Sequence, residues 1–313
     1  MTKLALVFPG QGSQFVGMGK DFHDNFRESK LVYEEASDTI RVDLRKLCFD
    51  GPLDELTLTP NLQPALFVTE AAMLAALRAH AELDVVVAAG HSLGEYTALH
   101  AAGSLTVADG ARLTRLRGTE MAKAVPPGRG TMAAVLGLEA AQVEALCAKA
   151  RSVAKNELVE PANFNAPGQV VIAGTVDGVA QAAALLKDDP EFKGGRSIPL
   201  QVSAPFHCSL MEPARKAMAP VLAAAVFGEP RFKVIPNVSA QPELNQHTFA
   251  GLLTDQITRS VRWEQSMRQL RALGVETLVE VGPGRVLVGL HKRIDRELPT
   301  KSVGTIEQLK EFK

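Results

Sequence analysis

The sequence predicts an α/β protein in which a large domain, built on a parallel sheet, carries a smaller inserted domain. Short apolar, β-branched runs alternate with helical segments over most of the chain, a pattern typical of parallel strands covered by helices. The cluster Pro-Pro-Gly-Arg-Gly at residues 126–130 interrupts this pattern, and the rhythm of strands and helices changes after it. A chain of 313 residues is long enough for both parts.

The first part of the large domain is expected over residues 1–127. Strands are predicted at residues 4–8 and 83–87, and helices at residues 65–81, 93–102 and 107–123. The helix that Pro64 opens is apolar nearly all round, which predicts that it lies in the centre of the domain. Residues 38–54 carry a mixed pattern and are expected to form a loop.

The inserted domain is expected over residues 128–199. Strands are predicted at residues 131–137, 158–163, 169–174 and 196–200, and helices at residues 139–150 and 176–187. This βαββαβ order is that of the ferredoxin-like fold.

The large domain is expected to resume over residues 200–313. Strands are predicted at residues 232–236 and 277–281, and helices at residues 211–226, 248–258 and 263–273. The turn Gly282-Pro283-Gly284 leads into a last helix. Strands separated by helices in this way form a parallel sheet with both faces covered.

The composition excludes several classes of protein. Hydrophobic residues make up 46% of the chain, charged residues 22%, and the formal net charge is -1. We therefore expect no nucleic-acid partner, and no apolar run approaches the length of a secretory or membrane-spanning segment. The three cysteines, Cys48, Cys147 and Cys208, are too widely spaced for a disulfide framework or a thiolate zinc site. A reducing cytoplasm is the simplest compartment, and no metal site is expected.

Residues 88–95, Ala-Ala-Gly-His-Ser-Leu-Gly-Glu, place Ser92 in a Gly-x-Ser-x-Gly frame between a buried strand and a helix. Gly90 and Gly94 lack the Cβ atoms that would clash in so sharp a turn. The hydroxyl would project into a cleft above the sheet, beside free N–H groups at the helix start. This is the nucleophile elbow of α/β-hydrolase-like domains, and it favours acyl transfer through a serine ester. A chance match in a glycine-rich turn is the alternative, which the flanking strand and helix disfavour.

A serine nucleophile needs a base, and histidine is its usual proton acceptor. His91 is next to Ser92, but adjacent residues in a tight turn usually point apart, so we expect it beside the catalytic pair. His207 ends a strand and precedes a helix, where its side chain would project over the carboxyl ends of the strands. We therefore favour His207. The remaining histidines lie in polar or helical contexts: His23, His80, His100, His247 and His291.

Arg117 differs from the neighbouring Arg112 and Arg115. It lies four residues from both Leu113 and Met121, so it shares a helical row with two large apolar side chains. An arginine on such a row requires a buried anionic partner.

Seven short motifs occur in one order along nearly the whole chain: Gly-Gln-Gly-Ser-Gln at 10–14, Gly-His-Ser-Leu-Gly-Glu at 90–95, Arg-Leu-Arg-Gly at 115–118, Asn-Phe-Asn-Ala-Pro-Gly-Gln at 163–169, Pro-Phe-His-Cys at 205–208, Val-Arg-Trp at 261–263 and Gly-Pro-Gly at 282–284. Together, and in their spacing, they resemble the malonyl-CoA:acyl carrier protein transacylase family. The resemblance implies that Ser92 is acylated and that His207 acts as base and then as acid. It implies an oxyanion hole from the backbone N–H groups of Gln11 and Leu93, and a malonyl carboxylate bound by Arg117.

The resemblance implies three further site residues. The family orients its histidine through a backbone carbonyl, which corresponds here to Gln256, and Asn165 would lie near the site. Phe206 departs from the small residue expected in stand-alone bacterial members and resembles malonyl-selective domains of polyketide synthases. A ring beside the acyl Cα would crowd an α-methyl branch, so malonyl would be favoured over methylmalonyl.

The implied activity is ping-pong transfer of malonyl from malonyl-CoA to the phosphopantetheine thiol of acyl carrier protein, for fatty-acid synthesis. No cofactor is expected, because coenzyme A and phosphopantetheine belong to the substrates, and a monomer is expected. A trans-acting malonyl acyltransferase of a polyketide pathway is one alternative. A serine thioesterase or esterase is another, disfavoured because aspartates such as Asp177 and Asp188 fall in the inserted domain. An inactive carrier-protein docking module is the third.

Overall fold

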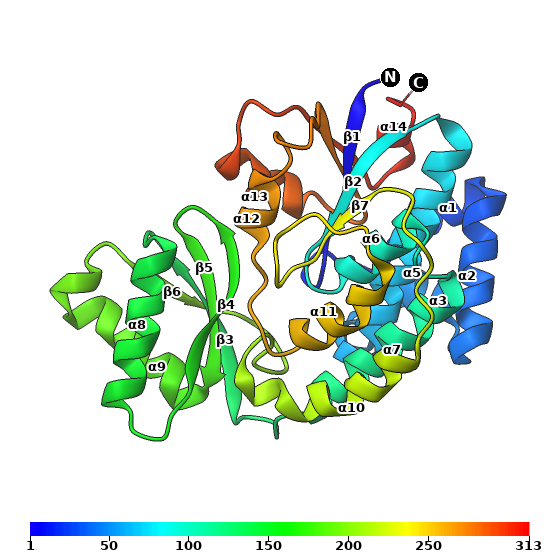
Figure 1. The fold of residues 1–313 in the computed structure, drawn as a ribbon. Coiled ribbons are helices and arrows are strands. Elements are labelled where there is room, and N and C mark those ends of the chain that lie inside the picture. The colour runs from blue at the N-terminus through cyan, green and yellow to red at the C-terminus, as the bar shows by residue number, and fades with distance from the viewer. Residues whose placement is uncertain (313) are drawn as a thin grey trace.

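A computed structural model describes residues 1–312 of the chain (Figure 1). Within this range the strands form a five-stranded sheet of order β7-β2-β1-β8-β9 and a four-stranded sheet of order β4-β5-β3-β6. The larger sheet is parallel and the smaller one is antiparallel. The predicted α/β class, with a smaller second sheet, is therefore confirmed.

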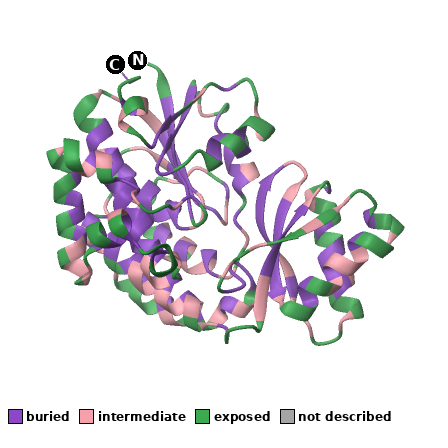
Figure 2. Ribbon diagram, turned by 180° about the vertical axis from the view of Figure 1, so that it is seen from behind, coloured by how far each residue is buried: buried purple, intermediate pink, exposed green. Residues whose placement is uncertain are grey.

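The larger sheet is built from strands that lie far apart in the sequence: β1 (Lys3–Phe8), β2 (Asp84–Gly90), β7 (Lys233–Ile235), β8 (Thr277–Val281) and β9 (Thr300–Val303). The central strand β1 is apolar over its whole length after Lys3, because helices cover it on both faces. Leu6 and Phe8 pack into one apolar cluster, and Ala5 and Val7 pack into the other. Figure 2 shows the strands buried at the centre and exposed helix faces outside.

Two groups of helices cover the two faces of this sheet. The larger cluster takes residues from α2 (Arg27–Ile40), α5 (Thr59–His80), α6 (Gly94–Ala102), α7 (Val107–Lys123), α10 (Glu212–Ala224) and α11 (Phe249–Gln256). The other takes residues from α12 (Trp263–Arg268) and α13 (Val286–Ile294). The short helices α1 (Lys20–Asn25), α3 (Leu44–Asp50), α4 (Leu53–Thr57) and α14 (Ile306–Leu309) complete this part. No helix within residues 1–312 is long and apolar enough to cross a membrane.

The central helix α5 begins earlier than the sequence predicts. It starts at Thr59, so Pro64 lies inside it rather than at its start. A proline has no N–H to donate to the carbonyl four residues earlier. Here that carbonyl, on Pro60, accepts a hydrogen bond from Arg115 Nη1 at 2.7 Å. The side chain from α7 replaces the missing bond and allows the helix to continue.

The expectation of a loop over residues 38–54 is wrong. Helix α3 begins after Asp43, whose side chain accepts a hydrogen bond from the backbone N–H of Lys46 at 3.1 Å. An aspartate at this position caps the start of a helix. The apolar face of α3 is short, with Leu44, Leu47 and Cys48 buried, which explains why periodicity did not reveal it.

The smaller sheet carries two helices. Its elements are β3 (Gly130–Leu136), α8 (Ala140–Val153), β4 (Val159–Ala166), β5 (Gln169–Thr175), α9 (Val176–Asp188) and β6 (Arg196–Pro199). This is the predicted βαββαβ order, and the strand order β4-β5-β3-β6 is that of a ferredoxin-like sheet. A separate apolar cluster lies between this sheet and its helices. The domain boundaries, residues 1–127 with 200–313 and residues 128–199, stay a prediction.

Candidate active site

A cavity of about 220 Å³ lies between the larger part of the chain and the smaller sheet. The larger part of the chain supplies Gln11, Gln63, Ser92, Leu93, Arg117 and Met121 to its wall, and the smaller sheet supplies Met132, Asn163, Asn165, Gln169 and Val171. The segment that connects them adds Leu200, Val202, Phe206 and His207, and α13 adds Val286, Leu287 and Leu290. The cavity therefore contains a candidate nucleophile, a base and a cation within mostly apolar walls.

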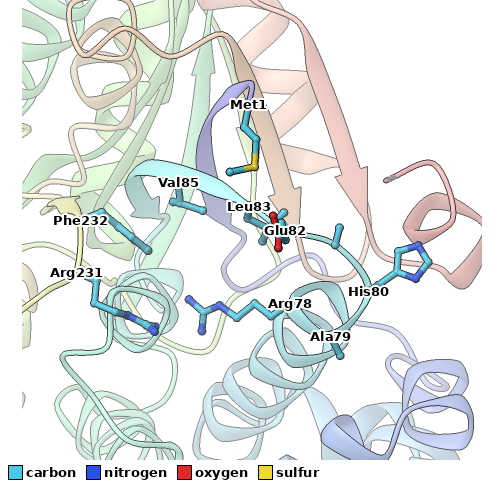
Figure 3. A pocket seen from close by; sticks show the side chains of 10 residues that line it. Met1, Arg78, Ala79, His80, Glu82, Leu83, Val85, Arg231 and Phe232 are labelled. Carbon is cyan, nitrogen blue, oxygen red and sulfur yellow. The ribbon is translucent and has the colours of Figure 1, made fainter.

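A larger cavity, of about 620 Å³, lies at the start of strand β2, at the end away from Ser92 (Figure 3). Arg78 and Arg231 extend along it, and both donate hydrogen bonds to the backbone oxygen of Ala101 near the end of α6, at 2.5 and 3.2 Å. Carbonyls at the end of a helix lack partners within the helix, so the two arginines complete α6. The wall has no serine or cysteine nucleophile, and the chemistry belongs to the smaller cavity.

Ser92 stands on the predicted sharp turn between β2 and α6. Its φ is 53°, in the left-handed region that non-glycine residues rarely adopt. A Cβ on Gly90 would lie 1.9 Å from the carbonyl carbon of Gly94, and one on Gly94 would lie 2.1 Å from the oxygen of Phe8. Only glycine fits at either position. The close packing of strand, turn and helix holds Ser92 in its strained conformation.

His207 is in place to take the proton of Ser92. The Ser92 Oγ lies 2.7 Å from His207 Nε2, and His207 Nδ1 lies 2.8 Å from the backbone oxygen of Gln256. A carbonyl oxygen only accepts, so Nδ1 carries the proton and Nε2 is left as the acceptor. Gln256 therefore contacts the histidine through the backbone carbonyl that the family resemblance implied.

The surroundings keep His207 neutral. Burial lowers the pKa of its imidazole to about 3, and the positive charge of Arg117 acts in the same direction. The hydrogen bond to the Gln256 carbonyl opposes both effects. Because the neutral imidazole is the form that accepts a proton, His207 is ready to act as a base throughout the neutral range.

Arg117 is a buried cation with no carboxylate beside it. Its side chain is 1% exposed, and it forms no ion pair within 4 Å in the described part of the chain. Its Nη1 donates to Gln63 Oε1 at 2.8 Å, and its Nη2 donates to Gln256 Oε1 at 2.9 Å and to Ser92 Oγ at 3.1 Å. Burial lowers the pKa of the guanidinium. The anionic partner that its position requires is thus not a protein side chain, which leaves a site for an anionic ligand.

Gln11 and Leu93 both line the cavity next to Ser92. Within residues 1–312, the backbone N–H of neither residue has a hydrogen-bond acceptor. Leu93 immediately precedes α6, so its N–H lies at the positive end of that helix. Two free amides beside a nucleophile are suited to a developing oxyanion.

The remaining predicted residues also lie at the cavity. Asn165 Oδ1 is 2.8 Å from His91 Nε2, and Phe206, which is 8% exposed, forms part of the wall. His91 contacts Asn165 and the ring of Trp263, with the two ring centres 5.6 Å apart, and makes no hydrogen bond to Ser92. This geometry agrees with the expectation that His91 lies beside the catalytic pair and is not the base.

Three polar residues of the site were not predicted. Asn237 accepts a hydrogen bond from the Ser92 N–H at 2.8 Å and donates to the Gly90 oxygen at 2.6 Å. Gln63 contacts Arg117, and Glu95 contacts Gln256. Two of them have a sequence feature that could have pointed to the site. Asn237 follows a buried parallel strand, and Gln63 is a polar residue in an otherwise apolar helix.

Within residues 1–312, no acidic side chain forms a hydrogen bond to His207, so none completes a hydrolase triad. Both ring nitrogens of His207 are occupied, one by Ser92 and the other by the Gln256 carbonyl. Asp177 and Asp188, the acids considered from the sequence, lie on α9 of the smaller sheet and make no hydrogen bond to His207. The site is therefore a serine–histidine pair oriented by a backbone oxygen.

Comparisons with known protein families, sequences and structures all find acyltransferases. The sequence matches the family described as the acyl transferase domain over residues 5–310. The malonyl CoA-acyl carrier protein transacylase of Bacillus subtilis strain 168 is 42% identical to this chain over 309 residues, which cover 99% of this chain and 96% of that protein.

Solved structures are similar over the same range. The acyl-carrier-protein S-malonyltransferase from Burkholderia pseudomallei 1710b is 42% identical, covers 99% of both chains and has a TM-score of 0.93. A malonyl-transacylase in complex with its type II PKS acyl-carrier protein is 39% identical, covers 98% of both chains and has a TM-score of 0.93.

Proposed function

This chain belongs to the acyl transferase domain family, and we propose that it moves a malonyl group from malonyl-CoA to the phosphopantetheine thiol of acyl carrier protein. It is an acyltransferase of the kind its relatives are named for, the malonyl CoA-acyl carrier protein transacylases. The observation that carries the proposal is the placement of Arg117, a buried cation with no carboxylate in direct contact, 3.1 Å from the hydroxyl of Ser92. A serine nucleophile beside such a cation is suited to an acyl group that ends in a carboxylate.

In the first half-reaction the Ser92 Oγ attacks the thioester carbonyl of malonyl-CoA. The hydroxyl proton passes to His207 Nε2, which lies 2.7 Å away, while the new C–O bond forms. The oxyanion of the tetrahedral intermediate accepts hydrogen bonds from the N–H groups of Gln11 and Leu93. The C–S bond then breaks, and the proton on Nε2 moves to the sulfur of the departing coenzyme A.

In the second half-reaction the phosphopantetheine thiol gives its proton to His207 Nε2 and attacks the malonyl ester carbonyl. The same two N–H groups bind the oxyanion. When the C–O bond breaks, the proton returns to the Ser92 Oγ, so the free enzyme is restored. The Gln256 carbonyl supports both halves, because it accepts the hydrogen bond of Nδ1–H and stabilises the imidazolium that forms each time.

Arg117 supplies the preference for a dicarboxylic acyl group. Its planar guanidinium can grip the free malonyl carboxylate through two parallel hydrogen bonds, which a lysine cannot reproduce. Phe206 narrows the same cavity. A ring beside the acyl Cα disfavours an α-methyl branch and so favours malonyl over methylmalonyl.

The reaction needs neither a metal ion nor a redox cofactor, because the thioester is already activated and the pantetheine belongs to the substrates. We place the protein in the cytoplasm as a monomer. Fatty-acid synthesis is the service that we propose first for this transfer, and transfer to a polyketide carrier protein is the second candidate. That candidate has a specific observation in its favour, the similarity to a malonyl-transacylase bound to a type II PKS acyl-carrier protein.

The test is a comparison of acyl donors with a holo acyl carrier protein as acceptor. We expect transfer from malonyl-CoA to be much faster than transfer from acetyl-CoA or methylmalonyl-CoA. Each donor is also incubated without any acceptor thiol. Rapid release of free malonate in that control would favour a thioesterase, and equal rates for the three donors would contradict a malonyl transferase.

A further inference from the structure

Glu95 is a buried carboxylate next to the nucleophile. It lies in the first turn of α6, and 1% of its surface is exposed. Its Oε2 accepts hydrogen bonds from Gln256 Nε2 at 2.7 Å and from the backbone N–H of Asn237 at 2.9 Å. Burying a carboxylate is costly unless donors satisfy it. Both donors here belong to residues that also contact the catalytic groups.

Gln256 is the link between Glu95 and those groups. Its side-chain Oε1 accepts from Arg117 Nη2 at 2.9 Å, and its backbone oxygen contacts His207 Nδ1 at 2.8 Å. Its Nε2 also donates to the backbone oxygen of Ser92 at 2.9 Å. A side-chain amide has an oxygen end and a nitrogen end of similar shape. The acceptors at Glu95 and at the Ser92 carbonyl together select the orientation in which the nitrogen faces Glu95 and the oxygen faces Arg117.

The charge of Glu95 also acts on Arg117 across this amide. Arg117 has no carboxylate within ion-pair distance in the described part of the chain, and Glu95 is one of the two groups whose charge favours the protonated guanidinium. A carboxylate in direct contact would occupy the hydrogen bonds that the substrate needs. A carboxylate one amide away offsets the buried positive charge and leaves the guanidinium free for the substrate.

We propose that ionised Glu95 is a positioning residue for the acyl transfer, which acts through Gln256 to hold Arg117 and His207 in their productive geometry. It touches neither the substrate nor the reacting atoms. The proposal rests on the proposed function of the Ser92 site and adds to it a charged group on which that site depends.

Glu95 would make the activity depend on pH. Burial raises the pKa of Glu95 to about 7, although the hydrogen bonds from Asn237 and Gln256 and the charge of Arg117 favour its ionised form. The charged and titratable groups that influence it or respond to it are Arg117 on α7 and Tyr96 on its own helix. His207 has a pKa of about 3 and stays neutral through this range. Activity lost as the pH falls through about 7 therefore reports Glu95 rather than the base.

The test compares Glu95→Gln with Glu70→Gln. Glu70 is a control for the loss of a buried carboxyl group, because it is also fully buried and is hydrogen-bonded to α6, through Thr97 Oγ1 at 2.5 Å, but contacts none of the catalytic residues. Burial raises the pKa of Glu70 well above the usual range of a carboxyl group, so this variant leaves the local charge unchanged. We expect Glu95→Gln to lower kcat/KM for malonyl-CoA roughly 10- to 100-fold, since a charge-assisted hydrogen bond becomes a neutral one. The acid-side inflection of the wild-type pH profile near 7 should disappear in Glu95→Gln and persist in Glu70→Gln.

Two further variants, Gln256→Met and the double variant Glu95→Gln/Gln256→Met, test whether Glu95 acts through Gln256. Because they are compared with each other, the result still counts if one single variant is unstable. Gln256→Met keeps the backbone carbonyl that contacts His207 but removes the amide. If Glu95 acts through that amide, the double variant loses about as much kcat/KM as the more damaging single variant. The free-energy losses of the two single variants then do not add. Additive losses, or a Glu95→Gln protein that retains the inflection and the wild-type kcat/KM, would overturn the proposal. The formation of a malonyl-serine ester by the wild-type protein is scored separately, so its absence would count against the function and not against Glu95.

Discussion

At the scale of single residues, the most informative feature of the site is a buried charge with no carboxylate in direct contact. Ser92 and His207 form a pair that many acyl-transfer enzymes share, whereas a buried guanidinium bound only by neutral groups is costly. Gln63, Gln256 and Ser92 supply those neutral contacts. An incoming carboxylate would therefore gain a desolvated, pre-oriented cation, which is how the site can prefer malonyl over acetyl.

Replacing Arg117 with alanine should change the substrate preference. The malonyl carboxylate would then be buried without its cation, at a cost of roughly 3–5 kcal/mol by analogy with broken buried ion pairs. An acetyl group carries no such charge. The ratio of kcat/KM for malonyl-CoA to that for acetyl-CoA should fall by roughly two to four powers of ten, and Arg117→Lys should recover only part of it.

Arg115 on the same helix provides the control. Its guanidinium donates to the Pro60 carbonyl in α5 and to Asn61 Oδ1, at 2.7 and 2.6 Å, and it does not line the cavity. Arg115→Ala should lower the melting temperature and leave the malonyl-to-acetyl ratio unchanged. If Arg117→Ala behaved in the same way, Arg117 would be a structural arginine and would have no place in the binding site.

The sequence allowed some of these residues to be predicted because their signal is local. Ser92 sits in a five-residue motif, and Arg117 shares a helical row with apolar side chains. Asn237 follows a buried strand, which marks its position but not its partners, and Glu95 gives no comparable signal. The roles of both depend on contacts between α6, the loop after β7 and α11. Gln256 could be proposed only from the family resemblance, because the atom that contacts His207 belongs to the backbone, which every residue has.

At the scale of elements, the elbow is the most constrained part of the fold. A Cβ on Gly94 would lie 2.1 Å from the backbone oxygen of Phe8 on β1. A backbone atom in the central strand cannot move as the tip of a side chain can. Gly94→Ala should therefore lower the free energy of unfolding by about 3 kcal/mol, at the upper end of the usual cost of overpacking, and should displace Ser92.

Gly251→Ala is the matched helical control. Gly251 lies in α11, and nothing lies within 4 Å of the Cβ that alanine would add. Alanine favours the helix over glycine by up to about 1 kcal/mol, so this variant should unfold at the same or a higher denaturant concentration than the wild type. Chemical denaturation of both variants, with serine acylation measured alongside, checks the prediction. A Gly94→Ala protein of wild-type stability would show that the close packing at the elbow is not required.

Three of the segments that were not predicted from the sequence share a physical cause. The helix α2 was not predicted either, although its buried residues Val32, Tyr33 and Ala36 follow a helical spacing. The helix α3 is short and depends on its cap, β9 is a four-residue edge strand with the mixed sequence Thr-Lys-Ser-Val, and the first turn of α5 needs Arg115 from another helix. None has a long apolar period of its own. The long buried elements, such as β1 and α7, were predicted because burial of a whole strand or helix face leaves a clear pattern.

At the scale of the whole molecule, the site is completed by side chains from both parts of the chain. The elbow after β2 supplies Ser92 and α7 supplies Arg117, while β4 supplies Asn163 and Asn165 to the facing wall. His207 lies on the segment that follows β6 and returns the chain to the larger sheet. The arrangement encloses a space of about 220 Å³, which suits the acyl end of a substrate whose bulk stays outside.

The central claim is that a malonyl group passes through Ser92 on its way from coenzyme A to the carrier protein. Intact-protein mass spectrometry tests it most directly, on the wild type and on Ser92→Ala, after incubation with malonyl-CoA and again after a holo acyl carrier protein is added. We expect the wild type to gain the mass of one malonyl group and to lose it to the carrier protein, and Ser92→Ala to gain nothing while keeping its melting temperature. A malonyl adduct on Ser92→Ala, or an adduct on the wild type that the carrier protein does not remove, would contradict the account.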